Sequence, residues 1–383
     1  MATTFKATDI ADYKIEAERS LHPHAWVYYS TASGGMETYQ DNRRVFERYR
    51  LRPRVLRGIA DVDISTSILG HRIKSPFCIA PTALHIFAHP NAELETAKAA
   101  SQYGTAMTLS SSSTTHMRTL SSTYPDGLFL KQTYILKNNN LMRLAMQEAE
   151  ASGFKAIVIT VDSVVRPQHR TLPLKDSEFL MTLLSKEENQ MVNYIFEEDE
   201  ESYRAYKEGP LGLTKYMVRQ GIRDTPMDIG VIRWVKSVVP NMKVIVKGIL
   251  TGKAAREAVD NGADAVWVSN HGGRQLDSVP ATLDVLSEVV DAVKGTQAEV
   301  YIDSGFRTGN DVFKALALGA RAVFIGRPVL WGLSVNGADG VYDVLGILAK
   351  ELRLCMTLCG CSSISDISKQ FIQKESDYLN CSL

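Results

Sequence analysis

The stretch AVWVSNHGGRQLDSVPA, residues 265–281, joins a short apolar run to a glycine-softened turn that carries an imidazole and a guanidinium. An apolar run of this length is typical of a strand buried on both faces of a parallel sheet. In α/β enzymes, the loops that follow such strands hold the reacting groups. His271 and Arg274 are therefore the first candidates for a functional site.

Short apolar runs of the same kind recur along the chain, with helical periodicity between them. Several of the helical segments end on Gly, the residue preferred just after a helix. Eight strand–helix units predict a (β/α)8 TIM barrel rather than an open doubly wound sheet, whose G-x-G-x-x-G loop is missing here. The runs are FCIA (77–80), AMTL (106–109), LFLK (128–131), AIVITV (156–161), KVIVK (243–247), AVWVS (265–269), EVYID (299–303) and AVFIG (322–326).

Two pieces of the chain fall outside this repeat. Residues 1–75 predict a helical and extended N-terminal lead-in, and residues 163–240 are far longer than a usual connection after the fourth strand. A long insertion on the face where barrels keep their active sites predicts a lid. For its acidic run, EEDEESYRAYKEGP, we favour a solvated segment without a role. We predict one domain over 1–383, with the barrel at about 76–345.

Composition excludes several classes of partner. The chain has 383 residues, 45% hydrophobic and 22% charged, and its formal net charge is zero. A balanced charge gives no support for binding nucleic acid or a membrane surface. The sequence shows no apolar run long enough for a membrane span, and its N-terminus is too polar for a secretory signal.

The cysteines predict neither a disulfide framework nor a metal site. Three of the five lie in CMTLCGC (355–361), and no second Cys or His cluster completes the four ligands typical of zinc. We expect reduced thiols in a reducing compartment. The C-terminal CSL resembles the peroxisomal signal Ser-Lys-Leu but lacks its basic middle residue, so a peroxisomal or a cytoplasmic location is expected.

Glycines and arginines follow the last two predicted strands. They occur in DSGFRTGNDV (303–312) and FIGRPV (324–329). Barrels often bind phosphate at this place through backbone N–H groups, a helix N-terminus and Arg. The alternative is a pair of ordinary turns with surface arginines.

SNHGGRQLD (269–277) and DSGFRTGNDVFKALALGARAVFIGRPV (303–329) together resemble the FMN-dependent α-hydroxy acid oxidase family, and glycolate oxidase most strongly. NRRVFERYRLRPRVL, IAPTA, AMTLSSS, QTY, ITVD, VKGI and KELRLCMTLCG match in the same order. The resemblance weakens in 163–240 and at the C-terminus. It implies that FMN is bound, that a small (S)-2-hydroxy acid is oxidised to the 2-keto acid, and that O2 is reduced to H2O2. It also suggests a homotetramer.

The resemblance assigns catalytic and substrate-binding roles. His271 is expected to take a proton from the 2-hydroxy acid, while Asp162 pairs with the imidazole and favours its protonated form. Arg274 is expected to bind the substrate carboxylate. Tyr28 and Tyr134 are expected to donate to the carboxylate and the 2-oxygen.

The resemblance also implies a set of cofactor-binding residues. Lys247 is expected beside the flavin N1–C2 carbonyl, where reduction builds negative charge that a fixed cation stabilises. Two further groups match positions that bind the isoalloxazine and ribityl (Thr82, Ala83, Ser110, Gln132, Thr160 and Ser269) and the ribityl–phosphate end (Asp303, Gly305, Arg307, Gly326 and Arg327).

Two departures from the family pattern concern the substrate. The arginine that closes on the substrate in relatives aligns with His169 without a gap and with Arg170 after a one-residue slip. We favour Arg170, because a carboxylate site requires a permanent cation. A bulky aromatic residue of glycolate-type members is replaced by Ser112, which predicts a pocket wider than a glycolate site.

Two other functions stay open at this point. The same flavin chemistry with an electron acceptor other than O2 fits the sequence equally well. An FMN-binding relative with altered or lost activity is also compatible with the rewritten insertion, although His271, Arg274, Tyr134 and Lys247 argue against it.

Overall fold

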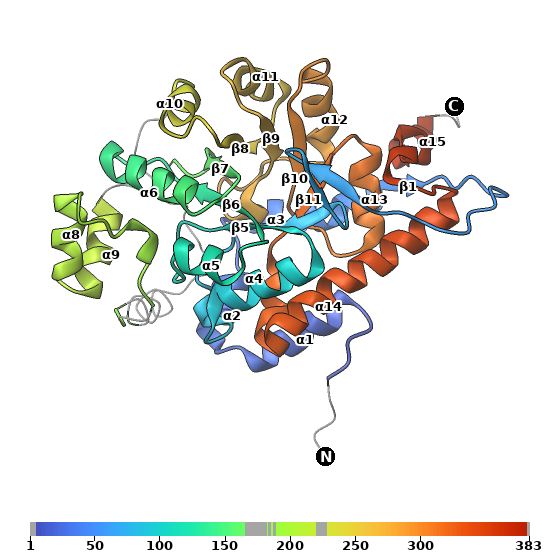
Figure 1. Cartoon of the computed structure of the whole chain (residues 1–383). Helices are drawn as coiled ribbons and strands as arrows, with labels where there is room; N and C mark the ends of the chain where they lie inside the picture. Colours follow the sequence, from blue (N-terminus) through green and yellow to red (C-terminus); the bar gives the residue numbers. More distant parts are fainter. Residues whose placement is uncertain (1–4, 165–181, 183–184, 187–188, 220–227, 381–383) are drawn as a thin grey trace.

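The computed structural model describes residues 5–164, 182, 185–186, 189–219 and 228–380. Eight parallel strands in it close into a barrel, in the order β10-β11-β4-β5-β6-β7-β8-β9. The predicted (β/α)8 barrel is thereby confirmed (Figure 1), and each predicted apolar run coincides with or overlaps one of its strands. The strands are β4 (Phe77–Ile79), β5 (Ala106–Leu109), β6 (Leu128–Thr133), β7 (Ala156–Thr160), β8 (Lys243–Ile249), β9 (Ala265–Val268), β10 (Glu299–Ile302) and β11 (Ala322–Ile325).

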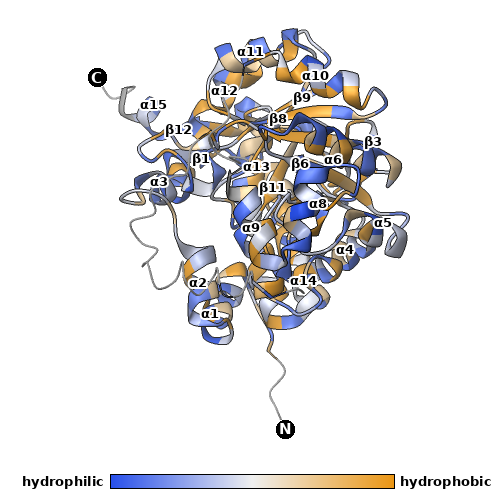
Figure 2. Cartoon of the chain, turned by 90° about the vertical axis from the view of Figure 1, so that its left-hand side faces the viewer, coloured by the Kyte–Doolittle hydropathy of each residue, from blue (hydrophilic) through white to orange (hydrophobic). Residues whose placement is uncertain are grey.

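Side chains alternate between the inside of the barrel and the layer under the helices. Trp267, Tyr301 and Phe324 fill the inside, where the Trp267 and Phe324 ring centroids lie 3.8 Å apart. The alternate positions, such as Leu109 and Phe129, belong to the larger core beneath the helices. Since successive residues of a strand point to opposite faces, parity decides which strand-end residues reach the mouth. Figure 2 shows the strands as mainly hydrophobic.

One helix follows each strand and covers the outside of the barrel. The last of them runs beyond the predicted boundary at about 345, and it has a kink with non-helical dihedral angles at Asn336 and Gly337. The barrel helices are α4 (Ala92–Tyr103), α5 (Met117–Thr123), α6 (Asn139–Ala151), α10 (Val231–Val238), α11 (Gly252–Asp260), α12 (Thr282–Ala292), α13 (Gly309–Ala317) and α14 (Arg327–Cys359).

The long connection between β7 and β8 ends in an ordinary barrel helix. Because α10 lies in its last part, the predicted insertion of 163–240 is shorter than expected. Its other described elements are η4 (Val192–Tyr194), α8 (Glu200–Lys207) and α9 (Pro210–Arg219). Asn193 fastens this segment to the barrel, because its amide donates to Thr115 O at 2.9 Å and accepts from Met117 N at 2.8 Å.

The N-terminal lead-in is helical and then extended, as expected. It comprises α1 (Ile10–Ser20), α2 (Pro23–Ser30), α3 (Glu37–Arg44), η1 (Val45–Arg48) and β1 (Tyr49–Leu51). α1 runs beside α14 (Figure 1), where Tyr13 OH donates to Asp343 Oδ2 at 2.8 Å. β1 pairs with β12 (Ile372–Lys374), which η6 (Ile364–Asp366) and η7 (Lys369–Phe371) precede and α15 (Glu375–Asn380) follows.

A hairpin closes the end of the barrel opposite the strand carboxyl ends. It consists of β2 (Thr66–Ile68) and β3 (His71–Ile73), and its Ile68 and Ile73 join the apolar cluster inside the barrel. Leu69 N also donates to the Glu299 carboxylate at the start of β10. In the described part of the chain, the open end of the barrel is therefore the one at the carboxyl ends of the strands, which we call the mouth. In the described part of the chain, no helix has the length and apolarity required to cross a membrane.

Candidate active site

Most residues that the sequence analysis singled out lie at this one mouth of the barrel. Parity puts them there: Lys247, for example, lies two residues beyond Ile245 of the barrel interior. The set at the carboxyl ends of the strands and in the loops that follow comprises Thr82, Ala83, Ser110, Ser112, Gln132, Tyr134, Thr160, Asp162, Lys247, Ser269, His271, Arg274, Asp303, Gly305, Arg307, Gly326 and Arg327. Tyr28 reaches the same mouth from α2.

His271 has a strained backbone directly after β9, in η5 (His271–Gly273). Its φ is +59°, in the left-handed region that disfavours a side chain, and its N–H donates to Ser269 Oγ at 3.0 Å. The imidazole Nδ1 lies 2.9 Å from Asp162 Oδ1, which follows β7. A strained residue held by its neighbours is typical of a functional site. With Nδ1 engaged by Asp162, Nε2 is the nitrogen available to a substrate.

The surroundings of His271 favour the neutral imidazole. Burial lowers the pKa of His271 and Lys247 lowers it further, while Asp162 opposes them. We expected Asp162 to favour the protonated ring, and the difference arises because burial outweighs the pair. Burial alone would raise the pKa of Asp162, but His271 and Lys247 lower it, so the carboxylate stays charged. A neutral base beside a fixed carboxylate can accept a proton and is stabilised once it has done so.

Arg274 is positioned by the N-terminal lead-in. Its Nη1 donates to the backbone carbonyls of Tyr28 at 2.8 Å and Thr31 at 3.0 Å. The guanidinium also lies 5.0 Å from the centroid of the Tyr28 ring. Stacking and fixed hydrogen bonds orient the planar fork that binds a carboxylate. α2 therefore forms part of the wall of the site.

Lys247 is buried at the centre of the mouth. Its Nζ donates to Ser269 Oγ at 2.9 Å and lies 3.6 Å from Asp303 Oδ2. Ser269 Oγ in turn donates to Asp303 Oδ1 at 2.7 Å. An ammonium group at this position can stabilise negative charge that develops nearby.

Amide and hydroxyl groups are linked along the β5–β7 side. Gln132 Nε2 donates to Thr160 Oγ1 at 3.0 Å, and Gln132 Oε1 accepts from Ser111 N at 2.9 Å. Ser112 N donates to Ser110 Oγ at 3.1 Å. The chain of bonds fixes the direction of each donor before a ligand arrives.

Three arginines surround the loop after β10. Arg43 from α3 donates to Gly305 O and lies 3.4 Å from Asp311. Burial and the neighbouring Arg43 lower the pKa of Arg307 to about 9, and burial and Arg274 lower the pKa of Arg327 to about 10. Because these neighbouring cations repel one another in a half-buried place, an anion bound among them would be stabilised.

This arginine cluster fits the phosphate of FMN. α14 starts at Arg327, and Gly305 has φ +89°, with Asn42 O in contact with the place of a Cβ. A side chain at Gly305 is thus excluded, which lets the loop after β10 pack directly against the backbone of α3, beside Arg43. Lys247 and the amides of the β5–β7 side fit the ring end.

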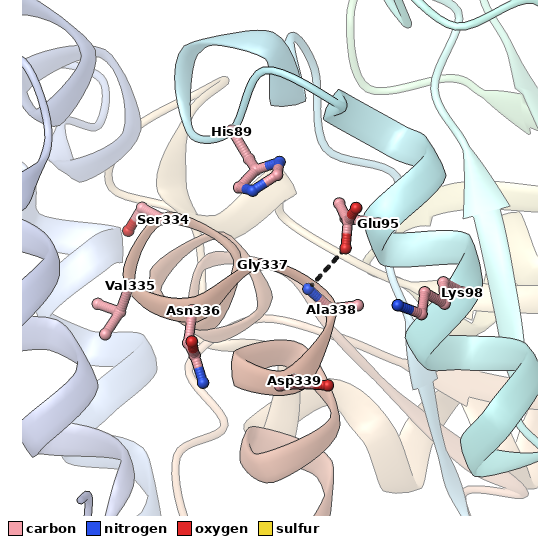
Figure 3. A pocket seen from close by; sticks show the side chains of 9 residues that line it. All are labelled: His89, Glu95, Lys98, Ser334, Val335, Asn336, Gly337, Ala338 and Asp339. Atoms are coloured by element: carbon pink, nitrogen blue, oxygen red, sulfur yellow. Dashed lines mark hydrogen bonds between the residues drawn. The ribbon is translucent and has the colours of Figure 1, made fainter. Parts of the chain in front are cut away.

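A separate pocket lies away from the mouth, between the start of α4 and the kink of α14 (Figure 3). Glu95 Oε2 accepts Ala338 N at 3.1 Å there, and so caps the second half of α14. His89, Lys98 and Asp339 line the same pocket. Because Glu95 accepts the N–H at the start of the second half of α14, we assign the side chains around this pocket to the packing of that helix.

Sequence reasoning missed two contributors and named one residue that cannot be placed. Arg43 was noted only for its position in a matching segment, and Tyr39, whose ring lies 4.8 Å from the Arg327 guanidinium, was not noted at all. Both lie on α3, whose charged residues are typical of a helix exposed to solvent, so the sequence offers no sign that they take part in a site. Arg170 and its alternative His169 lie outside the described residues.

The barrel, the arginine cluster and the His271–Asp162 pair together define an enzyme that binds a phosphate-bearing cofactor above its strands. Comparison with known proteins agrees with this. A family model described as FMN-dependent dehydrogenase matches residues 17–374. 2-Hydroxyacid oxidase 1 of Mus musculus is 41% identical over 365 residues, which cover 95% of this chain and 96% of that protein. Glycolate oxidase 1 of Oryza sativa subsp. indica is 39% identical over 372 residues, 97% of each chain.

Solved structures give the same assignment. A soluble mutant of the membrane-associated (S)-mandelate dehydrogenase from Pseudomonas putida superimposes with a TM-score of 0.85 at 29% identity, over 97% of this chain and 100% of that one. The chain belongs to the FMN-dependent dehydrogenase family. It is an oxidoreductase, and its cofactor is FMN.

Proposed function

We propose that this chain oxidises a small (S)-2-hydroxy acid to the 2-keto acid and passes the electrons to O2, which gives H2O2. The observation that carries the proposal is that His271 Nδ1 lies 2.9 Å from Asp162 Oδ1, while His271 itself is on the same loop as Arg274. A base and a carboxylate-binding guanidinium three residues apart suit a substrate whose hydroxyl is next to its carboxylate. The names of the relatives, among them 2-hydroxyacid oxidase and glycolate oxidase, support it.

The residues divide the work as follows. Arg274 binds the substrate carboxylate, and Tyr28 and Tyr134 donate to the carboxylate and the 2-oxygen. His271 Nε2 takes a proton from the 2-hydroxy acid. Asp162 then stabilises the imidazolium, because a charged carboxylate at hydrogen-bond distance favours the cation once it forms.

FMN supplies the two-electron acceptor for the carbon that is oxidised. Thr82, Ala83, Ser110, Gln132, Thr160 and Ser269 are proposed to hold its ring and ribityl, and Asp303, Gly305, Arg307, Gly326 and Arg327 its ribityl–phosphate end. Lys247 is proposed to stabilise the negative charge of the reduced ring.

The test is an anaerobic titration of the yellow holoenzyme with a panel of 2-hydroxy acids. We expect the flavin absorbance to bleach, the 2-keto acid to form in equal amount, and O2 to restore the colour with release of H2O2. Failure of every 2-hydroxy acid to bleach the flavin would refute the proposal. Bleaching followed by slow reoxidation in O2, but fast reoxidation by a quinone or another carrier, would replace the acceptor alone.

The same proposal includes three further properties: the domain organisation, the oligomeric state and the cellular location of the protein. The whole chain, 1–383, acts as one domain, and four copies associate. Sedimentation of the holoenzyme tests the tetramer. The protein is proposed to be peroxisomal or cytoplasmic, and imaging of the tagged chain in cells decides between the two.

A further inference from the structure

A lysine is buried in the apolar layer behind the candidate flavin site. On β6, Gln132 points into the mouth, so its neighbour Lys131 points outward, under the helices. Lys131 is 3% exposed, in a layer whose other members include Leu109 and Phe129. Burying an ammonium among apolar side chains is costly unless its donors are satisfied. The hydrogen bonds of the Lys131 ammonium therefore decide whether its charge can be buried there.

The Lys131 ammonium binds backbone rather than a carboxylate in the part of the chain that the structure describes. Nζ donates to Gln132 O at 3.1 Å and to Ser110 O at 3.3 Å. Ser111 Oγ donates to the same Gln132 carbonyl at 2.9 Å. The two carbonyls belong to the residues whose side chains face the mouth from β5 and β6. Lys131 thus joins the two strand ends from behind.

Glu93 acts on Lys131 through its charge, and it is hydrogen-bonded to His85, which lies in the loop after β4. Glu93 is 1% exposed, its Oε2 accepts from Thr115 Oγ1 at 2.9 Å, and its Oε1 accepts from His85 N at 3.3 Å. His85, in η2 (His85–Phe87), lies 2.6 Å from Thr82 Oγ1 through Nε2. Three titratable groups therefore lie directly behind three residues proposed to bind the flavin: Thr82, Ser110 and Gln132.

The protonation of Lys131 can change near neutral pH. Burial lowers the pKa of Lys131 to about 7, while the charge of Glu93 opposes the shift. Burial also lowers the pKa of His85, again against Glu93. In the described part of the chain, Glu93 on α4 is the charged group of the overlying helices that acts on Lys131. The described charges that face His85 are likewise limited to Glu93.

We propose that Lys131 is a positioning residue for the flavin, and that its ammonium, supported by Glu93 and His85, sets the spacing of the β5 and β6 ends so that FMN affinity depends on its protonation. The proposal rests on the flavin-binding roles proposed above for Ser110 and Gln132. The charged form donates the stronger hydrogen bonds to both carbonyls. We therefore expect FMN to bind more tightly to the protonated enzyme and less tightly as pH rises through the pKa of Lys131.

The experiment is equilibrium dialysis of the holoenzyme against a series of FMN concentrations, repeated from about pH 6 to pH 9. It compares the wild type with Lys131→Met, which removes every donor, and Lys131→Gln, which keeps a neutral one. Thr105→Val is the matched control. Thr105 Oγ1 also makes a buried bond to a carbonyl, Phe77 O at 2.7 Å, but it joins β5 to β4 at the opposite end of the barrel.

From the acidic to the alkaline end of this range, we expect the FMN affinity of the wild type to fall roughly 10-fold more than that of Lys131→Met. Lys131→Met should bind FMN roughly 10-fold more weakly at the acidic end, and Lys131→Gln should be intermediate and without this pH dependence. The FMN phosphate titrates at about pH 6 in every variant, so the difference between variants is the readout. Thr105→Val should behave as the wild type.

Three results would overturn the proposal. They are a wild-type pH dependence that Lys131→Gln retains, wild-type affinity in Lys131→Met, and a loss in Thr105→Val as large as that in Lys131→Met. If Lys131→Met does not fold, the comparison of wild type with Lys131→Gln decides alone. No substrate is used, so a chain that binds FMN but oxidises no 2-hydroxy acid would refute the proposed function and leave this measurement readable.

Discussion

Gly248 and Asp162 are so close across β8 and β7 that a Cβ on Gly248 would lie 2.7 Å from Asp162 Cβ. Gly248 has φ +111°, a conformation that side chains rarely adopt, and it marks a register shift between Lys247 and Ile249 in the pairing with β9. The irregularity follows Lys247, whose inward direction is already set by parity, and it leaves space for the carboxylate that pairs with His271. The missing side chain at Gly248 thus makes room for the partner of the base.

The first prediction is that Gly248→Ala slows flavin reduction by the best substrate while FMN stays bound. The new methyl group would displace Asp162 and lengthen its contact with His271, and a misplaced catalytic group costs roughly 100-fold. Stopped-flow absorbance under anaerobic conditions measures the rate.

Gly346→Ala is the control for this change. Gly346 lies inside α14 with no atom near the place of its Cβ, so alanine there should leave the rate unchanged and favour the helix. Equal rates in Gly248→Ala and the wild type would show that the close approach is unimportant.

The second prediction concerns His271→Gln. Because a general base contributes roughly 10² to 10⁴-fold, this variant should lose nearly all flavin reduction but retain FMN. Single-turnover reduction tests it, with the visible spectrum as the check on bound flavin. An unchanged rate would mean that another group takes the proton.

The third prediction is a pH shift in Asp162→Asn. The base acts when it is neutral, so the rate falls as pH drops through the pKa of His271, which burial already lowers. Asp162 raises that pKa, hence its removal should move the acid limb of the kcat/KM profile to lower pH. The plateau should fall by roughly 100-fold, since the imidazolium loses its partner. An acid limb that stays in place or moves upward would contradict this sign.

The fourth prediction separates cofactor binding from stability. Arg307→Met should weaken FMN binding by roughly 100-fold, because the variant lacks a guanidinium that we propose binds the phosphate. The flavin-free protein should not lose thermal stability, since its arginines repel one another there. Inorganic phosphate should raise the Tm of the flavin-free wild type but not of Arg307→Met. Arg256→Met, at an exposed pair with Asp260, is the control.

The fifth prediction concerns substrate size. With Ser112 at the mouth in place of an aromatic ring, each extra substrate methylene buried there is worth about 0.8 kcal/mol. A 2-hydroxy acid with a longer aliphatic or an aromatic side chain should therefore show higher kcat/KM than glycolate. Ser112→Trp should return the preference to small acids, whereas Ser122→Trp, on the exposed face of α5, should not. Glycolate as the best substrate, with no effect of Ser112→Trp, would leave the wide pocket unsupported.

The barrel and much of its mouth were predictable, because strand length and a period of two are local properties. Lys247 and Gln132 lie on the inward parity of apolar strands, and that parity can be counted in the sequence. The contribution of Arg43 was not predictable. It lies 262 residues before the Gly305 carbonyl that it binds, on a helix whose charges are typical of an exposed surface.

Two properties depend on burial, which the residues alone do not reveal. Asp162 next to His271 suggested a protonated ring, yet the depth of the site and the nearby Lys247 favour the neutral one. Lys131 stood at the end of an apolar run as an unremarked residue, and only the packed helices turn it into a buried cation.

Arg327 binds the backbone carbonyls of Tyr29 and Thr31, which lie 298 and 296 residues earlier in the chain. At about 5–20 residues per second, a ribosome needs roughly 15 to 60 s to travel between them. The first helices must therefore wait, without their partner, until nearly the whole polypeptide has emerged. A chain that ends before Arg327 lacks these bonds and one of the three clustered cations, so we expect the proposed phosphate site to be completed only late in synthesis.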